Sequence, residues 1–380
     1  MPADTAGFSL TRVLAVMIKE FKQLTRDRLT YAMMLAMPVV QLLLFGYAIN
    51  SEPRHLPTAV LVQEDSVFAR SITAALKNSA YFDFVAQART PAELDDMVRR
   101  GDVQFAITIP GDFTRRVARG DKAQMLVEVD ASDPSATGAA VAALAALPDQ
   151  ALANDLKGAL APEAGKAPFE VVVHRRYNPE AITSYNIVPG LLGVILSMTL
   201  VMMTALSVTR EAERGTMESL LATPVEPIEV MVGKLAPYVA VGLIQTAIIL
   251  LLARFLFDVP MIGGWIGLSA GVALFILGSL ALGFLMSTVA RTQLQAMQMS
   301  MFYILPSILL SGFMFPFRGM PAWAQALGEV VPVTHFLRVV RGALLKGQDL
   351  GDMWRELLAL VAFVCVVTAL AMARYRRTLD

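Results

Sequence analysis

Six long apolar runs dominate this chain of 380 residues. Each spans roughly 18 to 25 residues, the length that an α-helix needs to cross about 30 Å of hydrocarbon. Hydrophobic residues make up 56% of the chain and charged residues only 17%, which lies outside the range of ordinary soluble domains. The sequence therefore predicts an α-helical polytopic membrane protein with six transmembrane helices, at residues 29–49, 187–208, 236–257, 265–289, 297–314 and 357–373.

Basic residues near the ends of these runs indicate which side each connection faces, because cytoplasmic loops carry an excess of Lys and Arg. They gather before the first run and after the second, fourth and sixth, which predicts that both termini and the loop 209–234 are cytoplasmic. The first run is too long for a cleaved signal peptide, so we expect an uncleaved anchor. One segment departs from the pattern, because the expected outer side between the last two runs carries Arg318, Arg338, Arg341, Lys346 and Arg355.

Residues 1–28 precede the first run. Between positions 9 and 26, apolar side chains recur at helical spacing while Lys and Arg occupy the other face. Such a pattern predicts an interfacial helix lying on the cytoplasmic leaflet. The alternative is an ordinary amphipathic helix packed on protein.

Residues 50–185 differ in kind, because charged residues are frequent and strand-like and helix-like stretches alternate. This alternation predicts an inserted extracytoplasmic α/β domain with a mixed sheet. One helix should begin at Thr90, with Pro91 at its first position and Glu93 closing a capping box. The Ala-rich run 136–160 is expected to form one long helix. The expected strands are Thr58–Val62, Tyr81–Ala86, Val103–Ile109, Met125–Val129 and Phe169–Val173.

Motifs for catalysis are missing from the sequence. No GxxxxGK[ST] pattern occurs, so the chain lacks that route to ATP hydrolysis. His55, His174 and His335 lie on the expected outer side without metal-ligand spacing, so we expect solvated histidines and no metal site. Lys+Arg and Asp+Glu balance at 32 each, which gives no reason to expect nucleic acid as a partner. We therefore expect a membrane protein that is not an enzyme and has no bound cofactor.

The apolar runs contain few ionisable residues, which argues against an ion-coupled transporter with its own proton relay. They do contain uncharged polar side chains that could line a substrate path. Hydrogen bonding between helices is the alternative role for such groups. The candidates for the path are Gln41, Gln245, Gln298, Ser307 and Ser311.

The loop 209–234 lies between two of the apolar runs and is strongly charged. It combines two short helical stretches with a Gly that can act as a hinge and a Thr-Pro pair that stops a helix. These features suit a surface that another protein binds.

Three stretches together resemble the permease subunits of the ABC-2 superfamily of ATP-driven exporters, in the subgroup with a large extracytoplasmic domain between spans one and two. The resemblance covers nearly the whole chain. The first stretch runs from Arg176-Tyr177-Asn178-Pro179-Glu180 to Val188-Pro189-Gly190-Leu191, and the second is the loop 209–234. The third contains Leu305-Pro306, Leu310-Ser311-Gly312, Phe315-Pro316, Met320-Pro321-Ala322-Trp323 and Pro332-Val333-Thr334.

The resemblance implies that a separate ABC ATPase subunit uses ATP and Mg on the cytoplasmic side, and that two permeases pair as a homodimer or with a paralogue. It also implies short re-entrant helices in the outer segment 315–355, with Trp323 at the interface and basic side chains reaching lipid headgroups. A periplasmic adaptor is a further expected partner. The residues expected to couple to the ATPase are Arg210, Glu211, Glu213, Arg214, Gly215, Thr216, Glu218, Thr223 and Pro224.

The function that these features favour is export of a hydrophobic or amphipathic, drug-like compound across the bacterial inner membrane. Two alternatives stay open. The cargo could be a lipid or a glycan, or the permease could transmit ATP-driven motion to a periplasmic partner while nothing crosses. A continuous polar lining would favour transport, and a large exposed apolar patch on the α/β domain would favour transmission.

Overall fold

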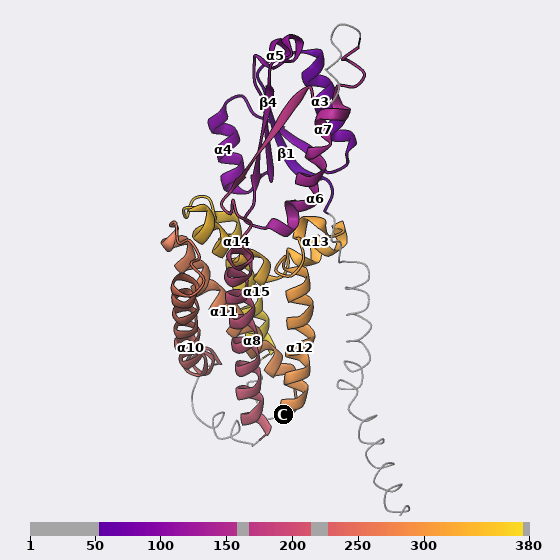
Figure 1. The fold of residues 1–380 in the computed structure, drawn as a ribbon. Helices are drawn as coiled ribbons and strands as arrows, with labels where there is room; N and C mark the ends of the chain where they lie inside the picture. Colours follow the sequence, from indigo (N-terminus) through magenta and orange to yellow (C-terminus); the bar gives the residue numbers. More distant parts are fainter. Residues whose placement is uncertain (1–52, 158–166, 214–226, 375–380) are drawn as a thin grey trace, which may run out of the picture.

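A computed structural model of the chain describes residues 53–157, 167–213 and 227–374. The expected interfacial helix 1–28, the first apolar run with Gln41, and the loop residues from Arg214 to Pro224 lie outside the described residues. Figure 1 shows an α/β region at one end of a bundle of long helices, with several short helices between the two.

The α/β region is built on a five-stranded sheet of order β2-β1-β3-β4-β5. Neighbouring strands are parallel except β3 and β4, which are antiparallel, so the expected mixed sheet is confirmed. All five expected strands are present, and their bounds differ from the expected ones by at most three residues. The strands are β1 (Leu56–Val62), β2 (Phe82–Gln87), β3 (Phe105–Ile109), β4 (Ala123–Asp130) and β5 (Phe169–Arg176).

Helices cover both faces of the sheet because its central strands β1 and β3 carry buried apolar side chains on both faces. On one face, Ala59 and Leu61 of β1 pack with Leu94 of α4 (Pro91–Arg100). On the other, Leu56 and Val60 join the core formed with α3 (Val67–Asn78), α5 (Phe113–Arg119), α6 (Pro134–Ala145) and α7 (Leu147–Ala151). The α/β region therefore has two buried cores, one on each side of the sheet.

The start of α4 largely follows the sequence prediction. The Thr90 hydroxyl accepts a hydrogen bond from the Glu93 amide at 3.2 Å, and Pro91 occupies the first helical position. The Glu93 carboxylate bonds the amide of Arg89 at 2.8 Å, which is one residue before the amide that a capping box uses. Thr90 is thus confirmed as the cap.

The single long helix expected from the Ala-rich run is wrong. The chain forms α6, breaks at Ala146 and begins a new short helix, α7, at Leu147. Pro148 lies in the first turn of α7, where its missing amide hydrogen is tolerated, whereas a continuous helix would leave the carbonyl four residues earlier without its donor.

The described part of the bundle has five long helices, namely α8 (Thr183–Glu213), α10 (Pro227–Phe255), α11 (Trp265–Val289), α12 (Gln293–Leu310) and α15 (Trp354–Arg374). Within the described residues, α8, α10, α11 and α15 are long and apolar enough to cross a membrane. The helix α12 is not among these four, and it carries three glutamines, yet it packs against α8. The count of six spans therefore remains a prediction.

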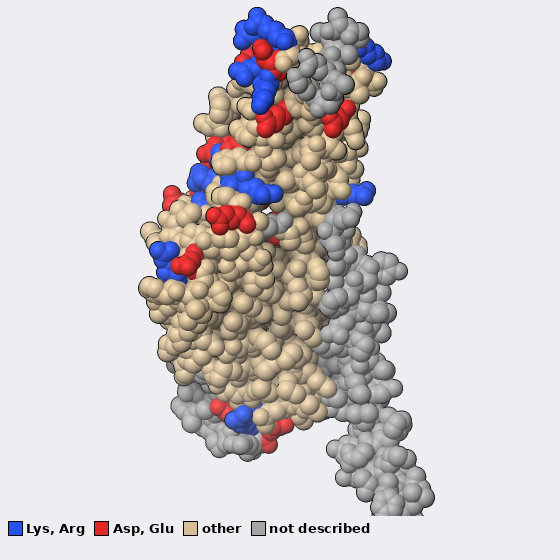
Figure 2. Space-filling model, viewed as in Figure 1, with Lys and Arg blue, Asp and Glu red and all other residues tan. Residues whose placement is uncertain are grey.

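The bundle presents an apolar band to its surroundings. On the face shown in Figure 2, charged residues gather on the α/β region, at its junction with the bundle and at the opposite end, with few between. The helices α10 and α15 are mostly exposed along their apolar windows, whereas half or more of the windows of α8 and α11 is buried. This distribution is the one expected when lipid surrounds the outer helices.

The capping segment, residues 315–355, connects α12 to α15 at the end of the bundle that carries the α/β region. It contains the two short helices α13 (Ala322–Gly328) and α14 (Pro332–Arg341), preceded by the turn η3 (Phe317–Gly319) and followed by the turn η4 (Gly342–Lys346). In Figure 1 these elements lie between the sheet and the long helices.

Candidate functional site

The last turn of α8 carries the three predicted coupling residues that the structure describes. The Arg210 guanidinium donates to the Gln293 side chain at 3.2 Å. The Glu213 carboxylate accepts from the Gln293 amide at 2.9 Å and from its side-chain nitrogen at 2.6 Å. Glu211 lies in the same turn. The remaining coupling residues, Arg214, Gly215, Thr216, Glu218, Thr223 and Pro224, lie outside the described residues.

Gln293 is the first residue of α12, and the start of this helix is well fixed. The Thr292 hydroxyl caps it by accepting from the Gln295 amide at 3.2 Å, and the Gln295 side chain accepts from the Arg291 amide at 2.8 Å. The contact of Gln293 with Arg210 and Glu213 joins the end of α8 directly to the start of α12. A displacement of the chain that follows α8 would therefore act on both helices.

Four of the five predicted path residues are described, Gln245 on α10 and Gln298, Ser307 and Ser311 on α12 or at its end. Gln245 of α10 donates to Thr199 of α8 at 3.3 Å, a bond between helices. Ser307 and Ser311 bond carbonyls of their own helix, at 2.7 and 2.9 Å. The side-chain oxygens of Gln245 and Gln298 are buried without a partner within the described part of the chain.

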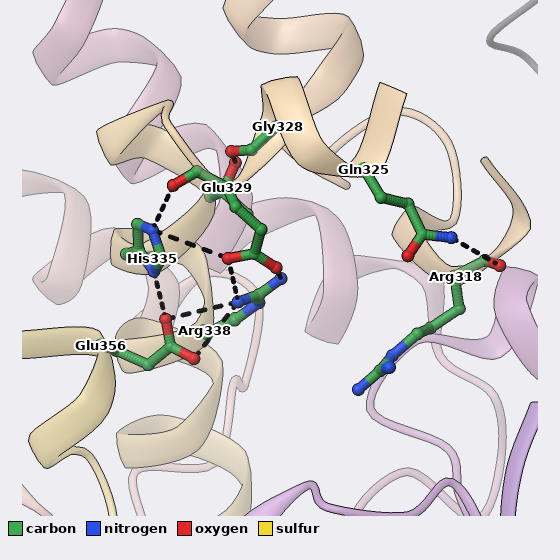
Figure 3. A network of polar contacts seen from close by, with 8 residues as sticks. Arg318, Gln325, Gly328, Glu329, His335, Arg338 and Glu356 are labelled. Atoms are coloured by element: carbon green, nitrogen blue, oxygen red, sulfur yellow. Dashed lines mark hydrogen bonds and ion pairs between the residues drawn. The ribbon is translucent and has the colours of Figure 1, made fainter. Parts of the chain in front are cut away.

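A charged network in the capping segment was not predicted from the sequence. Figure 3 shows His335 and Arg338 of α14 directed at two carboxylates, Glu329 and Glu356. The His335 ring contacts the Glu356 carboxylate through Nδ1 at 2.5 Å and the Glu329 carbonyl through Nε2 at 2.8 Å. Arg338 donates to Glu329 at 2.6 Å and to Glu356 at 3.3 Å, and its guanidinium lies 4.7 Å from the centre of the Phe317 ring.

The expectation of a solvated His335 is wrong, because its side chain is buried against this network. Burial opposes the charged ring, but hydrogen bonds to Glu356 and to the Glu329 carbonyl outweigh it and raise the pKa of His335. The i, i+3 spacing of His335 and Arg338 was the only local signal for the network, since Glu356 belongs to a different helix. No group of three or more possible metal ligands occurs among the residues described.

Three other basic side chains of the capping segment lie close to protein carboxylates, whereas the resemblance suggested lipid headgroups. Lys346 pairs with Asp130 at the end of β4, and Arg341 lies 3.9 Å from Asp133. Arg355 lies 3.6 Å from Asp102. The α/β region supplies all these acids, which the sequence pattern alone could not bring together with their partners.

Comparison with known proteins agrees with this architecture. The family described as ABC-2 family transporter protein matches residues 28–373. The probable multidrug ABC transporter permease YbhS of Escherichia coli K12 is 30% identical over 377 residues, which cover 98% of each chain. The probable multidrug ABC transporter permease YbhR of the same strain is 25% identical over 366 residues, which cover 96% of this chain and 98% of YbhR. The inner membrane transport permease YhhJ of that strain is 27% identical over 301 residues, which cover 76% and 77% of the two chains.

The matched region includes the α/β region, the bundle and the capping segment. A family of this kind is a transport component that works with an ABC ATPase partner, which accounts for a chain without a P-loop. The chain belongs to the ABC-2 family of transporter permeases.

Proposed function

We propose that this chain is the permease subunit of an ATP-driven exporter that moves a hydrophobic or amphipathic, drug-like compound across the bacterial inner membrane. A separate ATPase subunit hydrolyses ATP with Mg, and two permeases form the translocation unit, as a homodimer or with a paralogue. A periplasmic adaptor is a further partner in this proposal. The relatives named as multidrug permeases and as an inner membrane transport permease support the substrate class and the location.

The observation that carries the proposal is the contact between the end of α8 and the start of α12. The last turn of α8 lies at the end of the bundle away from the α/β region. A protein that binds the loop after α8 and pushes it would move α8 and α12 together, because Gln293 bonds both Arg210 and Glu213. ATPase closure can reach the helices of the bundle through this contact.

The substrate class also suits the chemistry of α12. Its described side chains include glutamines and serines among apolar neighbours and no charged group. A helix without charged side chains suits a neutral or weakly polar amphipathic cargo better than a strongly charged one. Export of a lipid or a glycan remains an alternative cargo for the same route.

The first experiment is affinity purification of the full chain from native membranes in mild detergent, followed by ATPase and efflux measurements. We expect a P-loop ATPase at a one-to-one ratio and ATP-dependent efflux of an amphipathic dye such as Hoechst 33342 from proteoliposomes. An ATPase that co-purifies but drives no efflux of dye, lipid or glycan would favour mechanical transmission to a periplasmic partner. The absence of any ATPase under several mild conditions would contradict the exporter proposal.

The variant Glu218→Lys tests the assigned docking loop. Reversal of this charge places like charges in a contact that should be complementary, so the ATPase should be lost while the permease still inserts. Asp83→Lys is the matched control, because Asp83 is an exposed acid on β2 of the α/β region. Normal recovery of the ATPase with Glu218→Lys would rule out this role for the loop.

A further inference from the structure

The α/β region and the capping segment meet through a set of ion pairs. Asp352 of the capping segment pairs with Arg99 at the end of α4, and Arg100 lies 3.9 Å from the same carboxylate. Gln348 donates to the Arg99 carbonyl at 2.5 Å. With the Lys346–Asp130 and Arg355–Asp102 pairs, these contacts spread across the junction instead of forming a single hinge point.

Two of the carboxylates in these ion pairs also accept hydrogen bonds from nearby backbone amides. Asp352 accepts from the Asp349 amide at 3.1 Å and is 11% exposed. Asp130 accepts from the Ser132 amide at 3.1 Å and is 7% exposed. Ion pairs formed by such fixed and poorly solvated carboxylates resist separation. A carboxylate that loses its Arg or Lys partner stays desolvated and unpaired, which costs free energy.

Lys346 is one of the poorly exposed residues of the junction. Its side chain is 10% exposed, pairs with Asp130 and lies 5.6 Å from the centre of the Tyr177 ring. Tyr177 begins the connection from β5 to α8 and adopts φ 69°, a backbone conformation that is uncommon for a bulky residue. The connection from β5 to α8 and the turn that follows α14 are therefore in contact through Tyr177 and Lys346.

The same segment packs closely on the bundle through α14. Phe336 stacks on Phe275 of α11, with ring centres 4.2 Å apart and planes 4° from parallel. A Cβ at Gly193 of α8 would lie 3.1 Å from Phe336, and one at Gly271 of α11 would lie 2.7 Å from Val339. Since tightly packed interfaces transmit displacement, a movement of α8 or α11 must move α14.

We infer that the α/β region and residues 332–355 form one rigid unit, and that Asp352 and Lys346 are positioning residues through which movement of the bundle reaches the α/β region. The inference rests on the proposed function for the source of the movement. In this arrangement α14 moves the α/β region when the bundle changes conformation. A periplasmic partner bound to the α/β region would then sense the state of the bundle.

Rigidity is tested by cross-linking Asp102→Cys with Arg355→Cys in a Cys365→Ser background, using a short bis-methanethiosulfonate reagent on the permease–ATPase complex. Both native side chains are exposed, at 46% and 72%, so the reagent can reach them. We expect equal cross-linking yields without nucleotide and with ATP and vanadate, and a cross-linked complex that keeps its transport rate. A yield that falls at least threefold in one state, or transport lost on cross-linking, would overturn the inference.

Transmission is tested by Asp352→Arg, which turns the pair with Arg99 into a repulsion. We expect at least a tenfold loss of dye efflux with unchanged membrane level and ATPase recovery, and near-normal efflux for Asp352→Glu, which keeps the charge. Asp65→Arg is the matched control, because the Asp65–Arg70 pair is exposed and far from the junction. Normal efflux by Asp352→Arg would refute the role of this residue. A wild-type complex without efflux would instead refute the export proposal. The cross-linking result would then decide by itself whether the unit is rigid.

Discussion

The ring of His335 has a hydrogen-bond acceptor at each nitrogen, so only the protonated imidazole can donate to both. This geometry explains why the pKa of His335 is raised despite its burial. Because the folded pKa lies above the unfolded one, the stabilisation from this charge is fully present below the unfolded pKa. It is lost as the pH rises through the folded pKa. The network that joins α14 to α15 should therefore weaken in alkaline solution.

The variant His335→Gln, which carries no titratable group, tests this expectation. The thermal midpoint of the wild-type chain in detergent should exceed that of the variant most at about pH 6, near the ordinary pKa of histidine, and the difference should shrink toward alkaline pH. Glu356→Gln, which removes the charged acceptor, should flatten the pH dependence that the wild type shows. A difference between wild type and His335→Gln that is constant with pH would contradict the protonated ring.

At the scale of elements, the bundle depends on glycines that let two helices approach closely. A Cβ at Gly283 of α11 would lie 2.5 Å from the backbone carbonyl oxygen of Val201 in α8. Backbone atoms cannot turn aside as a flexible side chain can, so any side chain at this position forces the two helices apart. The close approach of α8 and α11 in turn supports α14, which packs against both.

Gly283→Ala should therefore destabilise the fold by about 1–3 kcal/mol, the usual cost of overpacking. Gly138 in α6 offers the matched control, because a Cβ there meets no atom within 4 Å. Gly138→Ala should leave stability unchanged or raise it by up to about 1 kcal/mol, since Ala is the better helix former. Thermal unfolding of both variants in the same detergent measures the difference, and equal effects would contradict the packing argument.

For the whole molecule, the α/β region and the last turn of α8 lie at opposite ends of an apolar bundle. We expect such a body to cross a membrane with these two parts on different sides, because charged side chains at either end are costly in hydrocarbon. The excess of basic residues around the loop after α8 predicts that this end is cytoplasmic.

Cysteine labelling in intact spheroplasts tests that orientation. In a Cys365→Ser background, a membrane-impermeant maleimide should label Asp83→Cys on β2 at once. It should label Thr216→Cys, in the loop, only after the membrane is permeabilised. The reverse pattern would invert the orientation and place the ATPase-binding loop on the wrong side for the proposed function.

The membrane class of the protein, the five strands and the start of α4 at Thr90 can be predicted from the amino-acid sequence alone. Each of these features follows from a pattern of residues that are close together in the sequence. A long apolar run forms a helix in lipid, alternating apolar residues form a strand, and a Thr followed by Pro caps a helix. The resemblance carried by the stretches around Tyr177, the loop 209–234 and Pro306 correctly identified the family. The prediction was wrong in the Ala-rich run, where composition favoured one helix but a second one begins at Leu147, just before Pro148.

Which polar groups meet cannot be predicted from the sequence and depends on how the chain folds. Lys346 and Asp130 are 216 positions apart, and Arg99 and Asp352 are 253 apart, so no periodicity connects them. The same holds for His335, whose partner Glu356 belongs to another helix. In a sequence, a charged residue that will be buried and paired looks the same as one that stays in water. Its contribution to stability appears only when folding removes water from it and supplies a partner. The junction between the α/β region and the bundle is therefore a property of the folded chain.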